Sequence, residues 1–203
     1  MRRVAIVGAG MTAFKEHFDL GIKDLIPMAV SEMAASVDKG LDRSDIQAAW
    51  FGELTTTDGF PSGILADSCD LLDIPVTRVE NACATGNDAV RNATYAVASG
   101  AFDVALVVGA DKVRESSSRS TFWEWAKLTR DVAWDYPVGL VAPANFALHA
   151  ARYLHESPAT REHLAMVAVK NHNAAAFPFK NEAGEYDPNV VLDFDYWAAI
   201  PKR

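Results

Sequence analysis

The sequence predicts an α/β protein built on a parallel sheet. Along the first 112 residues, short apolar runs rich in Val and Ile alternate with segments of helical periodicity, and Gly or Pro separates many of them. The chain has 203 residues, half of them hydrophobic and 23% charged, which is the balance of an ordinary globular protein. This length allows one large domain or two small ones, and either can bury a core.

The alternation predicts each element in turn. Strands are expected at residues 4–7, 49–54, 77–81 and 103–109, where apolar residues are bounded by turn residues. Helices are expected at 23–38, 62–72 and 87–99; the first carries apolar side chains three and four residues apart, and Gly40 and Gly100 end the first and the third. These elements predict an α/β core over residues 1–112.

The character of the sequence changes after Lys112. Residues 116–137 are rich in Ser, Arg and Trp, helices are expected at 143–155 and 160–173, and residues from 177 onward have no regular pattern. We therefore predict a second region, residues 113–203, inserted upon the core. No strong strand follows Asp193, so we expect the sheet to be incomplete within this sequence.

Charge and cysteine content exclude several classes of protein. The formal net charge is −8, which argues against a general nucleic-acid binder because such proteins carry clustered Lys and Arg. The most apolar stretches, 4–9 and 104–110, are too short to span a bilayer. Two cysteines, Cys69 and Cys83, make neither a disulfide framework nor a CxxC zinc motif, so a reducing cytoplasm is expected and no metal site is predicted.

A glycine pair follows the first expected strand. Gly8-x-Gly10-x-x-Ala13 resembles a dinucleotide-binding fingerprint, in which a helix begins directly after the glycines. Residues 14–21 have no helical stripe, and no acidic residue ends a second strand at the expected distance. A plain turn is therefore favoured, and we predict no NAD site here.

The most informative stretch is Val-Glu-Asn-Ala-Cys-Ala-Thr-Gly at residues 79–86. It places Cys83 between an expected strand and an expected helix, where unpaired N–H groups and the helix dipole stabilise a thiolate. Ala84 and Gly86 leave room for an acyl group, and nearby backbone amides could hold an oxyanion. The alternative is a buried structural cysteine, and the residues alone leave both readings open.

The motif Asn-Ala-Cys-Ala-Thr-Gly at residues 81–86 resembles the nucleophile motif of thiolases, especially the sterol-carrier-protein or lipid-transfer branch. Residues 4–14, 103–112, 146–153 and 167–172 agree with that branch, so the resemblance spans nearly the whole chain. It implies the N-terminal half of a thiolase-like fold, layered α-β-α. It also implies that Cys83 accepts the acyl group of a coenzyme A thioester substrate, without a permanently bound cofactor.

The resemblance carries further expectations about architecture and partners. Residues 113–203 would cover the acyl-coenzyme A site, and the protein would form dimers or tetramers. Relatives in this branch often pair with a small zinc-bearing OB-fold subunit. The acid–base motifs of the second thiolase half are absent from these 203 residues, so we expect the chain to be part of a split or longer enzyme that cannot turn over alone.

Three functions remain open at this stage. The first is a thiolase-type acyltransferase that cleaves a 3-oxoacyl-coenzyme A or runs the reverse Claisen condensation through an acyl-cysteine. The second is a thiolase-like aldolase acting on a steroid side-chain thioester, and the third is a non-catalytic scaffold subunit.

Other candidate residues receive structural interpretations. Cys69 lies in an expected packing helix, and packing or surface roles are favoured for His17, His149, His155, His163 and His172. The aromatic cluster at residues 122–136 is expected to pack rather than to bind adenine, and no coenzyme-binding residue is assigned to the nearby Arg114, Arg119, Lys127 and Arg130.

Overall fold

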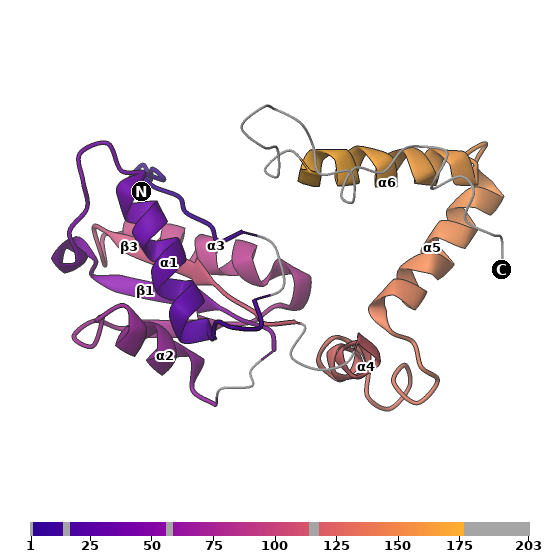
Figure 1. Ribbon diagram of the computed structural model, residues 1–203, viewed down its shortest axis with the longest axis horizontal. Helices are drawn as coiled ribbons and strands as arrows, with labels where there is room; N and C mark the ends of the chain where they lie inside the picture. Colours follow the sequence, from indigo (N-terminus) through magenta and orange to yellow (C-terminus); the bar gives the residue numbers. More distant parts are fainter. Residues whose placement is uncertain (1, 14–16, 56–58, 114–117, 177–203) are drawn as a thin grey trace. The chain divides into compact units, whose positions relative to one another are not determined.

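The computed structural model describes residues 2–13, 17–55, 59–113 and 118–176 (Figure 1). Two compact units divide the chain, Met1–Ala142 and Pro143–Arg203. The first unit contains the α/β elements that the sequence predicts after residue 20. In chain order these are α1 (Ile22–Ala35), β1 (Ala48–Gly52), α2 (Pro61–Ser68), β2 (Val76–Val79), α3 (Thr85–Ser99) and β3 (Ala105–Gly109).

The three strands form a parallel sheet in the order β2-β1-β3. Ala49 of β1 pairs with Val76 of β2 and with Leu106 of β3, so β1 is the central strand. The chain crosses from β1 to β2 through α2 and from β2 to β3 through α3, and these two moves run in opposite directions across the sheet. Right-handed crossovers then place α2 and α3 on opposite faces (Figure 1).

One face of the sheet carries the large apolar side chains. Phe51 of β1 and its register partner Val108 of β3 point to this face, where α1 and α2 cover them. Ile26 of α1 and Leu65 of α2 are buried in the same cluster. Because side chains alternate along a strand, this face is built from every second residue of β1 and β3.

The opposite face carries Ala48, Trp50 and Gly52 of β1, and α3 packs on it. Ala89 and Ala93 of α3 are buried against the sheet. The helix ends where the sequence predicts, because Gly100 takes a left-handed conformation with φ of 87° and its N–H bonds back to the last turn. Gly52 at the carboxyl end of β1 lies against Thr85, so the start of α3 is close to this end of the strand.

The predicted strand at residues 4–7 is wrong. This segment belongs to none of the paired strands in the described part of the chain, and Ile6 and Val7 are 83% and 61% exposed. It is anchored to helices instead: the Arg2 N–H donates to the Ala98 carbonyl at 3.1 Å, and the Met11 N–H to the Glu32 carboxylate at 2.9 Å.

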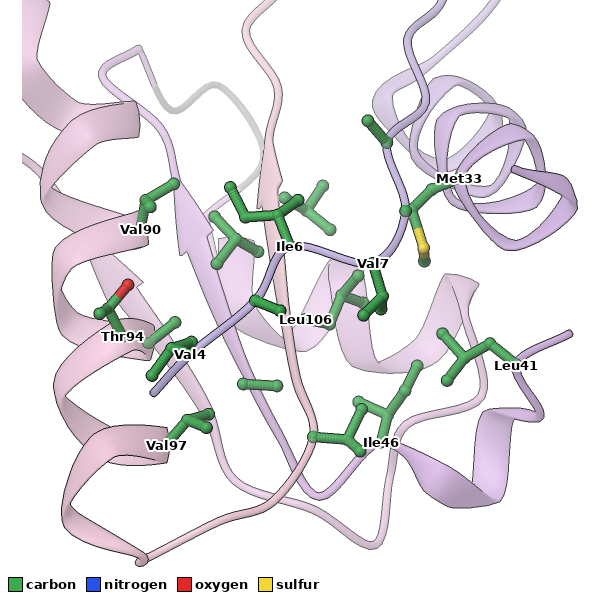
Figure 2. A pocket seen from close by; sticks show the side chains of 18 of the residues that line it. Val4, Ile6, Val7, Met33, Leu41, Ile46, Val90, Thr94, Val97 and Leu106 are labelled. Atoms are coloured by element: carbon green, nitrogen blue, oxygen red, sulfur yellow. The ribbon is translucent and has the colours of Figure 1, made fainter. Parts of the chain in front are cut away.

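A cavity of about 550 Å³ explains why residues 4–7 have no strand partner. It separates residues 3–10 from the outer edge of β3, and Figure 2 shows Ile6 and Leu106 facing it from opposite sides. Val97 of α3 and Met33 of α1 close its flanks. An apolar, β-prone run becomes a strand only when a neighbouring backbone is within hydrogen-bonding distance, and here none is.

The glycine pair has a packing role in this segment. A Cβ atom on Gly10 would lie 2.2 Å from the Met33 nitrogen and 2.3 Å from the Ala29 oxygen, both in the backbone of α1. A Cβ on Gly8 would lie 2.7 Å from a methyl of Val37. The glycines therefore let the amino-terminal segment lie against α1, which accounts for their spacing without a dinucleotide.

Replacing Gly10 with alanine is expected to lower the free energy of unfolding by about 1–2 kcal/mol, because the clash is with rigid backbone atoms. Urea unfolding followed by circular dichroism measures the change. Gly86→Ala is the matched control, since a Cβ there meets nothing within 4 Å and alanine is the better helix former, so the free energy of unfolding should not fall. Equal midpoints for the two variants would contradict the packing role.

The remaining helices are α4 (Ser118–Thr129) in the first unit and α5 (Ala142–Glu156) and α6 (Arg161–Ala176), which lie almost entirely in the second. The two helices predicted at 143–155 and 160–173 are therefore confirmed. The irregular tail from residue 177 lies outside the described residues. No helix in the described part of the chain is long and apolar enough to cross a bilayer.

Candidate functional site

Cys83 lies at the carboxyl edge of the sheet, between β2 and α3. It is the middle residue of a short 3₁₀ turn, η2 (Ala82–Ala84), and α3 begins at Thr85 directly after it. The side chain of Cys83 is exposed, not buried. The structure thus removes the reading of Cys83 as a buried structural cysteine and places its thiol at a helix N-terminus.

The turn before Cys83 has an unusual backbone. Ala82 adopts φ of 46°, a left-handed conformation that a residue with a Cβ seldom takes. Hydrogen bonds hold both sides of it: the Ala82 N–H donates to the Glu80 carboxylate at 2.6 Å, and its carbonyl accepts from the Thr85 hydroxyl at 2.7 Å. Strain of this kind persists only where the surroundings determine the geometry.

The amides around Cys83 are partly committed to the turn. The Ala84 N–H donates to the Asn81 carbonyl at 2.9 Å, and the Thr85 N–H donates to the Ala82 carbonyl. Together with the Ala82 N–H, these donors are already used inside the motif. The prediction that amides beside Cys83 hold an oxyanion therefore does not extend to these three groups and stays a prediction for the others.

Charged and polar residues that the sequence analysis missed follow the other strands at the same edge. Glu53 directly follows β1 and is 1% exposed, with its carboxylate 3.9 Å from Nε of Arg78 on β2. Asp111 follows β3, and its carboxylate accepts hydrogen bonds from the Leu54 N–H at 3.1 Å and the Thr55 N–H at 2.7 Å. Their position just after predicted strands is the signal that could have identified them.

These contacts tie the loop after β1 to strand β2 and to the loop after β3. Arg78 also donates to the backbone carbonyl of Glu53 at 3.3 Å, and the Glu53 N–H donates to the Val79 carbonyl at 3.4 Å. The edge that carries Cys83 is therefore cross-linked by polar contacts. A rigid strand edge of this kind is where parallel α/β folds place their ligand sites.

Cys69 has a different environment from Cys83. It caps the C-terminal end of α2, is half-buried, and packs against the apolar core. Burial raises the pKa of the Cys69 thiol, which disfavours the reactive thiolate near neutral pH. This environment agrees with the packing role expected for Cys69.

The histidines make local contacts. Nε2 of His17 lies 2.9 Å from the Ala13 carbonyl, and Nδ1 of His163 accepts a hydrogen bond from the Thr160 N–H at 3.0 Å at the start of α6. The ring of His149 contacts Phe146 one turn earlier in α5. Each of these contacts is of the structural kind predicted.

The aromatic cluster packs within its own segment. The rings of Trp123 and Tyr136 meet edge to face at 5.3 Å between centroids, and the Lys127 ammonium lies 5.8 Å from the Tyr136 ring centre. Trp134 is 79% exposed. Arg114 and the side chains of Arg119 and Phe122 lie outside the described residues, so the basic group is seen only in part.

We searched the described residues for a metal site and for a cavity beside Cys83. Across the residues that the structure places, no three His, Cys, Asp or Glu side chains gather to hold a metal ion. The cavity beside β3 is lined by residues of the amino-terminal segment, α1, α3 and β3, and Cys83 is not among them. The cavity therefore belongs to the packing of the sheet edge, and Cys83 lies elsewhere.

A family model described as "Thiolase, N-terminal domain" matches residues 4–191. The chain belongs to this family. The match extends through both units, from the amino-terminal segment across the Cys83 turn and beyond α6. The resemblance inferred from the cysteine motif is confirmed, and so is the thiolase-like fold of an N-terminal half.

Similar proteins support the same assignment of this thiolase domain. It is 34% identical over 210 residues to an acetyl-CoA acetyltransferase of Methanothermobacter thermautotrophicus, a match that covers 95% of this chain and 54% of that protein. It is 25% identical over 205 residues to human sterol carrier protein 2, covering 95% of the chain and 37% of that protein.

A solved structure titled "Ltp2-ChsH2(DUF35) aldolase" is similar across the domain. Its TM-score is 0.70 at 26% identity, with 95% of this chain and 47% of that chain covered. The thiolase domain thus spans about half the length of the archaeal relative and of the aldolase chain.

Proposed function

We propose that this thiolase domain supplies the nucleophile of an acyl-coenzyme A acyltransferase. The observation that carries the proposal is the exposed Cys83 thiol, held in a strained turn at the N-terminus of α3. An exposed thiol can be reached by an acyl donor, and cysteine is an effective nucleophile for forming a covalent acyl intermediate. The similarity to an acetyl-CoA acetyltransferase over 95% of the chain supports a coenzyme A thioester as substrate.

The proposed reaction forms and then breaks a thioester on Cys83. The thiolate attacks the carbonyl carbon of an acyl-coenzyme A, the bond from that carbon to coenzyme A sulfur breaks, and coenzyme A leaves as a thiolate that takes up a proton. A carbanion from a second acyl-coenzyme A then attacks the acyl-cysteine, giving a 3-oxoacyl-coenzyme A and restoring the Cys83 thiolate. Thiolytic cleavage is the same sequence in reverse.

The acid–base groups for this reaction are not assigned to the described residues. Because the relatives are about twice as long as the matched region, we propose that these groups belong to the part that the relatives have in addition. General acid–base catalysis requires a side chain within hydrogen-bonding reach of the reacting group. Residues 113–203 are proposed to cover the coenzyme A site, in a cytoplasmic enzyme that assembles as a dimer or tetramer.

A retro-aldol activity is the second candidate. The solved structure with a TM-score of 0.70 is titled as an aldolase containing two named components, which favours this reading and a partner subunit. An OB-fold, zinc-bearing protein is the partner we propose for that case. A retro-aldol cleavage needs no acylated cysteine, so the two candidates differ in whether Cys83 carries the acyl group. A scaffold subunit without chemistry is the third candidate.

Intact-mass measurement after mixing the protein with acetyl-coenzyme A or a 3-oxoacyl-coenzyme A tests the proposal. We expect a mass increase equal to the acyl group in the wild type and in Cys69→Ala, and none in Cys83→Ala. The Cys69→Ala variant is the matched control because it removes the other cysteine of the chain. The same measurement is then made after any copurifying subunit has been added, so that the assembled enzyme is tested as well.

The absence of an adduct in the assembled enzyme, while iodoacetamide still labels Cys83, would overturn the acyltransferase proposal. Cleavage of a 3-hydroxyacyl-coenzyme A under those conditions would establish the aldolase instead. If neither adduct nor cleavage occurs, the scaffold reading is the one that stands.

A further inference from the structure

We propose that Thr85 is a positioning residue, which with Gly52 holds the strained turn that presents Cys83. The inference rests on the proposed function, in which Cys83 is the nucleophile, and assigns to Thr85 and Gly52 the task of fixing its direction. The supporting contacts come from three parts of the fold: the 3₁₀ turn, the first residue of α3 and the last residue of β1.

The Thr85 hydroxyl connects the N–H of Asn81 with the carbonyl of Ala82. Its Oγ1 accepts a hydrogen bond from the Asn81 N–H at 2.9 Å and donates one to the Ala82 carbonyl at 2.7 Å. One side chain thereby satisfies a donor before the left-handed residue and an acceptor on it. Both bonds are made by a single oxygen, so the turn closes around Thr85.

The Thr85 side chain is itself held in place. Thr85 is 8% exposed, and its methyl group lies against Gly52, where an added Cβ would be 3.0 Å from Cγ2 of Thr85. A glycine at the end of β1 therefore provides the space in which the threonine methyl packs. The hydroxyl faces the turn and the methyl faces the sheet, so the orientation of Thr85 is determined on both sides.

The left-handed backbone of Ala82 explains why the contacts of Thr85 are needed. A left-handed alanine costs on the order of 1 kcal/mol, because its Cβ approaches a backbone oxygen. Without the Thr85 bridge, Ala82 can relax toward an ordinary conformation and turn the following residue, Cys83, away from its position at the start of α3. Small misplacements of a nucleophile have large effects on rate, since the reacting atoms must be aligned.

Alkylation of the full 203-residue chain by iodoacetamide measures the position of Cys83, with Cys69 as an internal reference. Peptide mass spectrometry follows both thiols in the same sample over time. The central variant is Thr85→Val, which keeps the shape of the side chain and removes the hydroxyl. The matched control is Thr94→Val, which makes the same change at a half-buried position later in α3.

We expect Thr85→Val to slow labelling of Cys83 by about fivefold relative to Thr94→Val, because the relaxed turn no longer holds the Cys83 thiol in its exposed position. Thr85→Ser keeps the bridging hydroxyl and should restore most of the rate. Ala82→Gly removes the backbone penalty, since glycine adopts positive φ freely. In the double variant Ala82→Gly/Thr85→Val, the loss should therefore shrink to about twofold or less.

A second pair tests the same arrangement without removing the hydroxyl. Gly52→Ala presses on the Thr85 methyl and should slow labelling of Cys83, whereas Gly52→Ala/Thr85→Ser lacks that methyl and should recover. If Thr85→Val unfolds, the labelling rates of Cys69 and Cys83 rise together. In that case the Gly52→Ala pair decides whether Thr85 positions Cys83.

Equal Cys83 rates in Thr85→Val and Thr94→Val would overturn the proposal, as would a Thr85→Val loss that Ala82→Gly leaves unchanged. If Thr85→Val unfolds, the absence of recovery in Gly52→Ala/Thr85→Ser would do the same. The positioning role and the proposed function fail separately. A Thr85-dependent labelling rate with no acyl adduct on Cys83 would retain the positioning role and reject acyl transfer.

Discussion

Replacing Phe51 with alanine lowers the free energy of unfolding by about 3–5 kcal/mol, an effect large enough to unfold many small domains. Phe51 is 0% exposed and lies on the central strand, between α1 and α2 on its apolar face. Removing the ring deletes buried apolar surface and leaves a cavity that the rigid sheet cannot close. Few other positions in the first unit combine such size with complete burial.

Equilibrium urea unfolding, followed by far-ultraviolet circular dichroism, measures this loss as a lower midpoint with an unchanged slope. Thr77→Ala, an exposed change on the neighbouring strand β2, is the control and should shift the free energy by no more than about 0.5 kcal/mol. A cost below about 1 kcal/mol for Phe51→Ala would show that the sheet is not the centre of the core.

Replacing Arg78 with methionine lowers the free energy of unfolding by about 2 kcal/mol, because it takes a cation away from a buried carboxylate. Glu53 is 1% exposed and its carboxylate lies 3.9 Å from Nε of Arg78. The full cost of breaking a buried pair is reduced here, since the Arg78 side chain is 38% exposed and water screens its charge.

A double-mutant cycle separates the charge from the lost packing. Glu53→Gln/Arg78→Met leaves no net charge at the pair and should be more stable than Arg78→Met alone. Arg78→Met should also slow iodoacetamide labelling of Cys83, because Arg78 connects β2, the strand that leads into the Cys83 turn, to the loop after β1. Additive free energies in the cycle would mean that the two side chains do not interact, contrary to this prediction.

The periodicity of the sequence was sufficient for most of the regular structure. The helices around residues 22–35 and 85–99 and the strand ending at Gly109 follow from apolar spacing, helix-ending glycine and β-branched residues, all of which act over a few neighbouring residues. The Cys83 motif was also recognisable, because its strand-to-helix position is local. The fold class followed from the periodicity, and the family followed from the resemblance of the Cys83 motif to that of thiolases.

The run at residues 4–7 shows where local pattern fails. Its composition is that of a buried strand, yet Ile6 is exposed and a cavity lies between this segment and β3. Strand formation depends on a partner backbone, and a partner is supplied by residues far away in the sequence. The same limit concealed the roles of Gly8 and Gly10, whose neighbours are backbone atoms of α1.

By itself, the sequence determined the α/β class, the order of helices and strands from α1 to β3, the helices α5 and α6, and a cysteine placed between a strand and a helix. Only the tertiary structure decided that Cys83 is exposed, that Ala82 before it is left-handed, that Thr85 and Gly52 pack at this turn, and that Glu53 and Arg78 pair at the same edge of the sheet. The reason is physical. Periodicity reports which face of an element is apolar, whereas the geometry of a site depends on contacts between strand ends that are brought together only when the sheet forms.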